Sequence, residues 1–191
     1  MANTAAVSVS DYVRLIRGNR NFRLLWTAQL ISEIGDWFYI VAIYSLLLEH
    51  TGTAKSIAFA FVLQVLPQTL FSPTCGVIND RLSRRQVMMF ADWSRAVIVL
   101  CMLLVRGPGL IWLLYVLLFF ETIAWGLFEP GRNASIPNIV AKSDILVANG
   151  LSSATWSFNL AVGSAIGGLV AVWLGRDAVF IINSLSFVAS G

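Results

Sequence analysis

The sequence predicts an all-α membrane protein, a polytopic bundle of about six transmembrane helices. Of its 191 residues, 58% are hydrophobic and only 12% are charged, whereas soluble domains carry about 25% charged residues. So few charges could not cover the surface of a water-soluble globule, and disordered chains are rich in charge rather than poor in it. The alternation of apolar and polar residues that is typical of membrane β-barrels is absent from the sequence.

Six apolar runs account for the predicted helices, and the first five are long enough to cross a hydrocarbon core of about 30 Å. In chain order the runs are 24–48, 57–77, 87–105, 110–128, 151–174 and 178 to the end. Short polar or glycine-containing turns separate them, except for a longer connection over residues 129–150 that contains two prolines. The sixth run is too short to span, so we expect that its helix is truncated and that the chain is the first part of a longer protein.

The basic residues predict the orientation of the bundle. If the N-terminus is cytoplasmic, nine of the 13 Lys and Arg residues lie at the inner ends of the runs, three lie at the outer ends and Arg95 lies within a span. Cytoplasmic loops are enriched in Lys and Arg, which favours this orientation in a plasma (inner) membrane. We therefore predict a basic cytoplasmic segment over 1–23 and a six-helix transmembrane domain over 24–191. Residues 11–23 form either a helix on the inner leaflet or a solvated basic tail.

Five ionisable residues lie well inside the predicted spans: Glu33, Asp36, Asp92, Arg95 and Glu121. An ionised side chain in lipid costs several kcal/mol unless it faces a partner or a water-filled cavity. Each of the five is therefore a candidate functional residue.

Glu33 and Asp36 are three residues apart and share a helix face, which Gln29 extends by one more turn. Two carboxylates on one buried face repel each other when both are ionised, which favours proton binding by one of them. We expect Glu33, Asp36 and Glu121 to be candidates for carrying a proton or contacting the substrate. The alternative is that these acids are only hydrogen-bonded between helices.

Asp92 and Arg95 are also three apart and can pair within one helix, with Glu121 as a third member from the next helix. For this pair we favour a structural role in helix packing. Four amide side chains either line a polar cavity or bridge helices. They are Gln64, Gln68, Asn159 and Asn183.

The connection between the second and third runs reads GVINDRLSRR over residues 76–85. It closely resembles the signature loop of the major facilitator superfamily, Gly-x-x-x-Asp-Arg-x-Gly-Arg-Arg, with serine in place of the second glycine. The matching residues are Gly76, Asp80, Arg81, Arg84 and Arg85. The glycine would let another helix approach closely, the aspartate would sit at the N-terminal end of a neighbouring helix, and the arginines would bind carboxylates. The resemblance implies that this loop switches the conformation by docking on a second half of the transporter.

Residues 159–168, NLAVGSAIGG, resemble the antiporter motif of the same family, Gly-x-x-x-Gly-Pro-x-x-Gly-Gly. Gly163, Gly167 and Gly168 match, whereas Asn159 and Ser164 depart from it. An ordinary close contact between helices would explain the same small residues. Residues 21–26 and 34–36 are most similar to the macrolide and siderophore exporter branch. The resemblance covers nearly the whole chain, as the N-terminal six-helix half of a twelve-helix transporter.

The resemblance implies a secondary active transporter, with proton-coupled efflux of drug-like or siderophore-like small molecules by alternating access. Its implied partners are the substrate, protons, the lipid bilayer and a C-terminal six-helix half outside this chain, with no nucleic acid and no cofactor. The alternatives are a major facilitator that takes its substrate up, and a six-helix scaffold or channel without active transport.

The sequence does not favour catalysis. The single histidine, His50, lies in an outer connection, where it cannot assist a serine at membrane depth. Residues 33–36 lack the first glycine of an intramembrane aspartyl protease motif. We find neither a group of residues with zinc-ligand spacing nor a phosphate-binding glycine loop, and therefore expect no enzyme and no metal site.

Overall fold

The computed structural model describes residues 8–191, and every regular element among them is a helix. The first seven residues of the predicted basic segment lie outside the described residues. A short helix, α1 (Val9–Gly18), comes before the bundle. The bundle consists of α2 (Arg20–Thr51), α3 (Ala54–Arg81), α4 (Arg84–Cys101), α5 (Ile111–Ile139), α6 (Ile145–Leu174) and α7 (Arg176–Ser190). Three single turns, η1 (Met102–Leu104), η2 (Pro108–Leu110) and η3 (Lys142–Asp144), complete the described elements.

Each of the six apolar runs forms a helix, which confirms the predicted all-α fold class. Five helices, α2 to α6 with the turns that extend them, are long and apolar enough to cross a membrane. The sixth run forms α7, which has 15 residues. The first long helix begins at Arg20, four residues before its apolar run.

The predicted connection over residues 129–150 is wrong for most of its length. α5 continues through Pro130 and Pro137 to Ile139, and α6 already begins at Ile145. A break was expected because proline lacks the amide hydrogen of the helix ladder. Prolines are tolerated in membrane helices where neighbouring groups compensate for the lost bonds. Here the segment packs into the bundle, with Arg132 and Ile136 buried.

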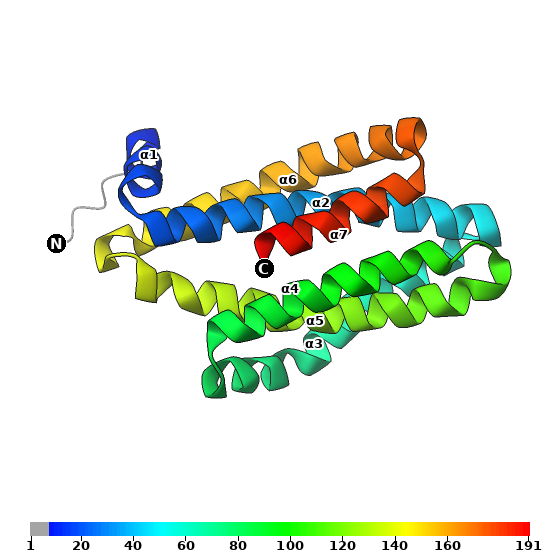
Figure 1. The fold of residues 1–191 in the computed structure, drawn as a ribbon, viewed down its shortest axis with the longest axis horizontal. Coiled ribbons are helices and arrows are strands. Elements are labelled where there is room, and N and C mark those ends of the chain that lie inside the picture. Colours follow the sequence, from blue (N-terminus) through cyan, green and yellow to red (C-terminus); the bar gives the residue numbers. More distant parts are fainter. Residues whose placement is uncertain (1–7) are drawn as a thin grey trace.

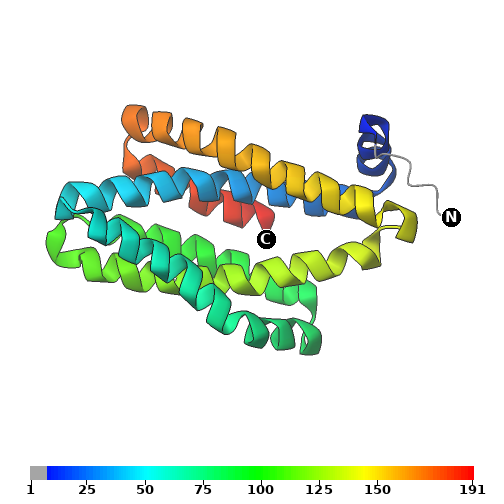
Figure 2. The same cartoon turned by 180° about the vertical axis from the view of Figure 1, so that it is seen from behind.

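The bundle consists of two groups of three helices that lie side by side (Figures 1 and 2). In one group α2 packs against α6 and α7, and in the other α5 packs against α3 and α4. The two groups meet mainly where α4 packs against α7. The packing pattern is symmetric between the two halves of the sequence: if α2 is swapped with α5, α3 with α6 and α4 with α7, the same pairs of helices pack together. Each group therefore combines one helix from one half of the sequence with two helices from the other half.

The main apolar core fills the space between α2, α4, α5 and α7, toward the ends of α2 and α4 that lie far from α1. Its fully buried members include Ile43, Leu47, Val99, Leu114 and Phe180. Burial of such side chains stabilises the fold by about 1.5–3 kcal/mol each. This core fixes the relative positions of the helices that carry the charged residues described below.

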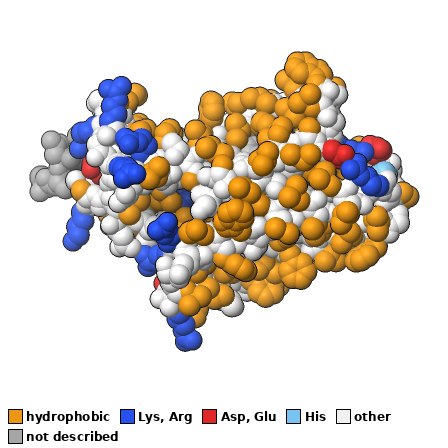
Figure 3. All heavy atoms as spheres, viewed as in Figure 1, with side chains coloured by type: hydrophobic (Ala, Val, Ile, Leu, Met, Phe, Trp, Pro, Cys, Tyr) orange, Lys and Arg blue, Asp and Glu red, His pale blue; other side chains and the backbone are white. Residues whose placement is uncertain are grey.

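The surface is divided as expected for a bundle in a bilayer. Hydrophobic side chains cover the middle of the molecule in Figure 3, and arginines gather at the end where α1 lies. Charged side chains reappear at the opposite end, where Arg106 pairs with Asp177 at 2.6 Å and Arg176 pairs with Glu49 at 2.8 Å. Exposed apolar side chains occur midway along the helices, for example Trp93 of α4, which is 50% exposed.

α1 is the helix that we considered for residues 11–23, although it ends earlier, at Gly18. Its Leu15 is buried in a second apolar cluster with Phe22, Ile136 and Val147, so α1 packs on the bundle. Hydrogen bonds from Ser8, first from its backbone N–H and then from its hydroxyl, lower the pKa of the exposed Asp11 carboxyl. Residues 9–18 of this segment therefore form a docked helix, and residues 20–23 form the first turn of α2.

Asn19 joins three helices at this end. Its side-chain oxygen accepts a hydrogen bond from the Phe22 backbone N–H at 3.0 Å, and its amide group donates to the Ile139 carbonyl at 2.5 Å. Asn19→Ala removes the cap of α2 and the link to α5, so we expect unfolding free energy to fall by about 1–2 kcal/mol. Denaturant titration in micelles measures this change. Asn138→Ala, at an exposed site, serves as the control, and equal stabilities for the two variants would contradict the prediction.

Candidate functional site

Four side chains from three helices form a buried charged cluster midway along α2, here called the Arg95 cluster. It contains Asp36 and Tyr39 of α2, Arg95 of α4 and Glu121 of α5. Arg95 Nη2 donates to both carboxylate oxygens of Asp36 at 2.8 Å, and its Nε donates to Glu121 Oε1 at 2.9 Å. The Tyr39 hydroxyl donates to Glu121 Oε2 at 2.8 Å. The guanidinium of Arg95, which belongs to α4, therefore links α2 to α5.

Burial makes the Arg95 cluster energetically important. Arg95 is 1% exposed and Glu121 is 4% exposed. The Phe187 ring of α7 covers the guanidinium, with its centroid 4.0 Å from Arg95 Cζ, at a distance suited to a cation–π interaction. Hydrogen bonds between ionised groups are about twice as strong as neutral ones. With both carboxylates ionised, the cluster has one negative charge more than it has positive charges.

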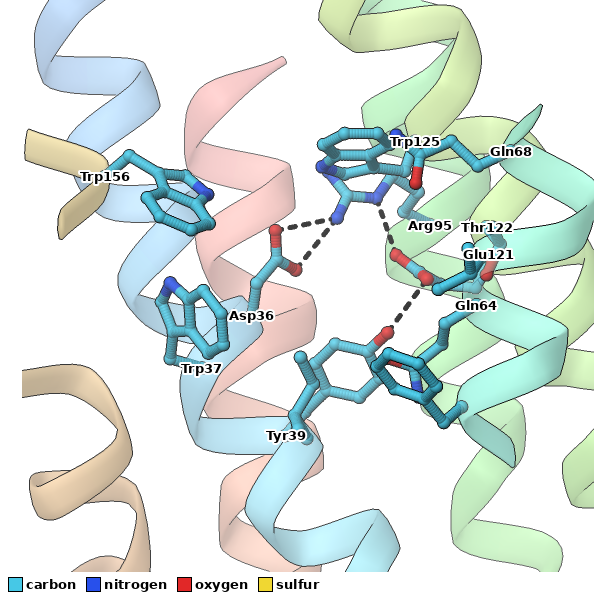
Figure 4. A pocket seen from close by; sticks show the side chains of 13 residues that line it. Asp36, Trp37, Tyr39, Gln64, Gln68, Arg95, Glu121, Thr122, Trp125 and Trp156 are labelled. Atoms are coloured by element: carbon cyan, nitrogen blue, oxygen red, sulfur yellow. Dashed lines mark hydrogen bonds and ion pairs between the residues drawn. The ribbon is translucent and has the colours of Figure 1, made fainter. Parts of the chain in front are cut away.

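A cavity of about 390 Å³ adjoins the Arg95 cluster (Figure 4). The Asp36 side chain is 15% exposed, so its carboxylate is the acid of the cluster that faces open space. Trp37 and Trp156 stand against each other on one side, with ring centroids 5.8 Å apart. The other labelled lining residues are Tyr39, Gln64, Gln68, Arg95, Glu121, Thr122 and Trp125. With both carboxylates ionised, the site therefore combines one net negative charge with several aromatic surfaces.

A second polar cluster lies closer to the N-terminal end of α2, here called the Gln29 cluster. It contains Gln29 and Glu33 of α2, Glu129 and Arg132 of α5, and Asn159 of α6. The Gln29 amide nitrogen donates to Glu33 Oε1 at 2.8 Å, and its oxygen accepts from Arg132 Nη1 at 2.9 Å. Arg132 also donates to Glu129 at 2.5 Å. The polar stripe from Gln29 to Glu33 is therefore present, but it extends to two other helices.

The sequence interpretation missed Glu129 and Arg132 because it placed them in a connecting loop. Arg132 is 5% exposed, so its side chain lies in the interior of the bundle and is not part of the basic surface. A signal was present in the spacing, because Glu129 and Arg132 are three residues apart and pair on one helix face.

Glu33 and Asp36 share a helix but contact different partners. Asp36 belongs to the Arg95 cluster and Glu33 to the Gln29 cluster. The expected pair of Asp92 and Arg95 is loose, with 3.9 Å between Arg95 Nη1 and Asp92 Oδ1. The hydrogen bonds of Arg95 go instead to Asp36 and Glu121. The bond from Arg95 to Asp36 was not predicted from the sequence.

Two side chains of the signature loop, Arg84 and Asn79, donate hydrogen bonds to backbone carbonyls of α5. Arg84 Nη1 donates to the Ala134 carbonyl of α5 at 2.8 Å, a backbone oxygen where a carboxylate was expected. Asp80, Arg81 and Arg85 are exposed. Nothing described lies within 4 Å of a Cβ placed on Gly76, so the close helix approach predicted there is not found in this part of the chain. The adjacent Asn79 is buried and donates to the Leu127 carbonyl of α5 at 2.9 Å.

Two glycines of the motif in α6 lie where α6 crosses α2. A Cβ on Gly163 would lie 2.9 Å from Trp37 Cβ, and a Cβ on Gly167 would lie 2.6 Å from the Phe38 Cα. Gly168 is less closely packed, because its Cβ would lie 4.0 Å from Val41 Cγ1 of α2, an ordinary contact. Gly163 and Gly167 therefore allow the close approach of the two helices.

Gln64 and Gln68 line the cavity, whereas Asn159 and Asn183 are buried between helices. Gln64 donates to the Tyr44 hydroxyl at 3.2 Å. Within residues 8–191, no three His, Cys, Asp or Glu side chains are arranged to hold a metal ion. The side chains that form the two clusters include carboxylates, arginines and amides.

A family model described as "Transmembrane secretion effector", one of those for major facilitator superfamily (MFS) transporters, matches residues 16–190. The chain belongs to the major facilitator superfamily. Membership in this superfamily, with five membrane-length apolar helices, makes the chain an integral membrane protein. The exchange of helices between the two groups also matches the inverted three-helix repeats of MFS halves.

Curated MFS proteins are similar to most of the chain. Macrolide efflux protein A of Streptococcus pyogenes is 29% identical over 172 residues, which cover 87% of this chain and 42% of that protein. The MFS-type transporter YfiS of Bacillus subtilis is 27% identical over 177 residues, covering 92% of this chain and 42% of YfiS. The chain thus spans about two fifths of the length of these relatives. No solved structure matches it significantly.

Proposed function

We propose that the chain is the N-terminal half of a secondary active transporter that exports small molecules in exchange for protons. In this proposal, residues 24–191 form one six-helix domain, and a second half completes a cavity that opens alternately to each side. The relatives' greater length supports the second half. The observation that carries the proposal is the Arg95 cluster, in which two acids and one arginine adjoin a cavity.

The charge of the Arg95 cluster supports proton coupling. Arg95 neutralises one carboxylate, so a proton or a cationic substrate at the second carboxylate gives an uncharged site. Asp36 is the better candidate than Glu121, because it is 15% exposed beside the cavity whereas Tyr39 covers Glu121. Glu33, one turn away on α2, serves as the second proton carrier. A charge that is neutralised before each conformational change avoids the cost of an unpaired ion in lipid.

The lining of the cavity supports an amphipathic, drug-like or siderophore-like substrate. Trp37, Trp125 and Trp156 offer apolar surfaces, and Gln64 and Gln68 offer hydrogen bonds. Small-molecule sites typically combine an apolar lining with a few polar groups. Export is supported by the similarity to a macrolide efflux protein.

The arginines at the α1 end support a cytoplasmic N-terminus in the plasma (inner) membrane. The signature loop then lies on the cytoplasmic side. Its residues Asp80, Arg81 and Arg85 are exposed and form no salt bridge within residues 8–191, so they are available to bind the second half in one conformation. Arg84 anchors the loop to α5.

Asp36→Asn tests the proposal in vesicles that contain the complete protein. We expect the variant to insert normally and to lose pH-gradient-driven transport of a labelled macrolide, because the amide cannot bind and release a proton. Asp177→Asn is the control, because its exposed carboxyl pairs with Arg106 at the opposite end of the bundle. Undiminished pH-driven export by Asp36→Asn would overturn the assignment. A flux that does not saturate and shows no exchange would favour a channel.

A further inference from the structure

The Gln29 amide lies between an arginine and a carboxylate, which fixes its orientation. Arginine has only hydrogen-bond donors, so the Gln29 oxygen must face Arg132 and accept from it. The amide nitrogen must then face Glu33, to which it donates at 2.8 Å. Gln29 is 2% exposed and also donates to the Ser152 carbonyl of α6 at 3.3 Å. It therefore cannot turn without breaking its bond to Arg132.

The other oxygen of Glu33 faces an amide whose orientation is not fixed in this way. Asn159 is 0% exposed, and its nitrogen donates to Glu33 Oε2 at 3.3 Å and to the Leu30 carbonyl at 3.4 Å. Its oxygen Oδ1 is buried without a hydrogen-bond partner. Buried unpaired acceptors are uncommon and costly, so this atom needs an explanation. A half-turn of the Asn159 amide would bring that oxygen toward Glu33.

We propose that Gln29 is a positioning residue that keeps Glu33 Oε1 as a hydrogen-bond acceptor, and that Asn159 is the switch that accepts a hydrogen bond from Oε2 when Oε2 is protonated. The proposal rests on the proposed function, in which Glu33 carries a proton. In the ionised state both amides donate to the carboxylate. On protonation the O–H of Oε2 donates to Asn159 Oδ1, and the amide turns away from the Leu30 carbonyl.

The charges around Glu33 allow this assignment. The charged groups that face it are Arg132 and Glu129 from α5, which pair with each other, and Asp36 from α2, which pairs with Arg95 of α4. α6 has no charged residue, and the charged residues of α7 lie in its first turn at the opposite end. Proton binding on Glu33 therefore changes the hydrogen bonds between α2 and α6, while the bond from Gln29 to α5 is retained.

Infrared difference spectroscopy of the purified chain tests both roles, with the Glu33 carboxyl band isolated by subtracting the Glu33→Gln spectrum. In Gln29→Leu the protonated band should persist to a pH about one unit higher, because a charge-assisted donor to the carboxylate is lost. Gln29→Glu keeps the size and the pairing with Arg132 and should shift the band in the same direction. Gln64→Leu, a half-buried glutamine that does not touch Glu33, should leave it unchanged.

Asn159→Leu tests the switch. Without an acceptor for its O–H, the protonated Glu33 should show a C=O stretching band at higher frequency than in the wild type. Asn183→Leu, also fully buried, is the matched control and should leave this band in place. Unchanged band positions in Asn159→Leu would overturn the switch, and an unchanged titration in both Gln29 variants would overturn the positioning role. Absence of any Glu33-dependent band would overturn the proton role of Glu33 itself, and the inference with it.

Discussion

Arg95→Met should lower the free energy of unfolding by about 3–5 kcal/mol, because it leaves two buried carboxylates without their shared partner. Arg95 donates to Asp36 at 2.8 Å and to Glu121 at 2.9 Å, and neither acid has another cation as close. Methionine fills a similar volume, so the loss reports on charge and hydrogen bonding rather than on a cavity. Denaturant titration in micelles, followed by the helical circular dichroism signal, measures the change.

The comparison with an exposed ion pair makes the prediction specific. Arg106→Met breaks the pair with Asp177 at 2.6 Å, where Arg106 is 65% exposed, and should cost less than about 1 kcal/mol. Adding Asp36→Asn and Glu121→Gln to Arg95→Met should restore part of the stability, because neutral amides replace unpaired charges. Equal losses for Arg95→Met and Arg106→Met would show that the Arg95 cluster does not stabilise the bundle.

Gly167→Val should cost about 3 kcal/mol, near the top of the usual range for overpacking. The new Cβ would lie 2.6 Å from Phe38 Cα, and a backbone atom cannot move aside as the end of a side chain can. α2 and α6 must therefore separate, which weakens the contacts that position Trp37 and Trp156 beside the cavity. Thermal unfolding in micelles measures the loss.

The neighbouring glycine provides a matched control. Gly168→Val makes the same chemical change one residue later in α6, where the Cβ would meet Val41 at 4.0 Å, an ordinary contact distance. We expect a change within about 0.5 kcal/mol there, as for most surface substitutions. A Gly168→Val variant as unstable as Gly167→Val would indicate that the valine side chain itself disfavours α6, and that the contact with α2 is not the cause.

Local spacing was sufficient to predict which polar residues share a helix face. Gln29 and Glu33, four residues apart, lie on one face as expected, and they form a hydrogen bond at 2.8 Å. The apolar runs likewise predicted the helices, because any segment that crosses a bilayer must satisfy its backbone hydrogen bonds internally. The pattern failed at the end of α5, where Pro130 and Pro137 suggested a loop but the helix continues.

Contacts between helices could not be predicted in this way. The bond from Arg95 to Asp36 joins residues 59 positions apart, and it depends on the rotation and axial register of two helices. Similarly, Arg132 reaches Gln29 across 103 positions only because α5 extends beyond its prolines. Neither contact leaves a periodic signal in the sequence, because each residue is spaced regularly only relative to the residues of its own helix.

The exchange of helices between the two groups also constrains how the protein is made. α2 is the first helix of the bundle to leave the ribosome, but its main neighbours, α6 and α7, are synthesised last. The hydrogen bond from Gln29 to Ser152 can form only after 123 more residues have been made. Because synthesis proceeds from the N-terminus, α2 enters the bilayer before Arg95, the partner of Asp36, and Asn159, a partner of Glu33, have been synthesised. The group formed by α2, α6 and α7 can therefore be completed only after nearly the whole chain has been synthesised. Until then, the nascent α2 must be kept from full contact with lipid.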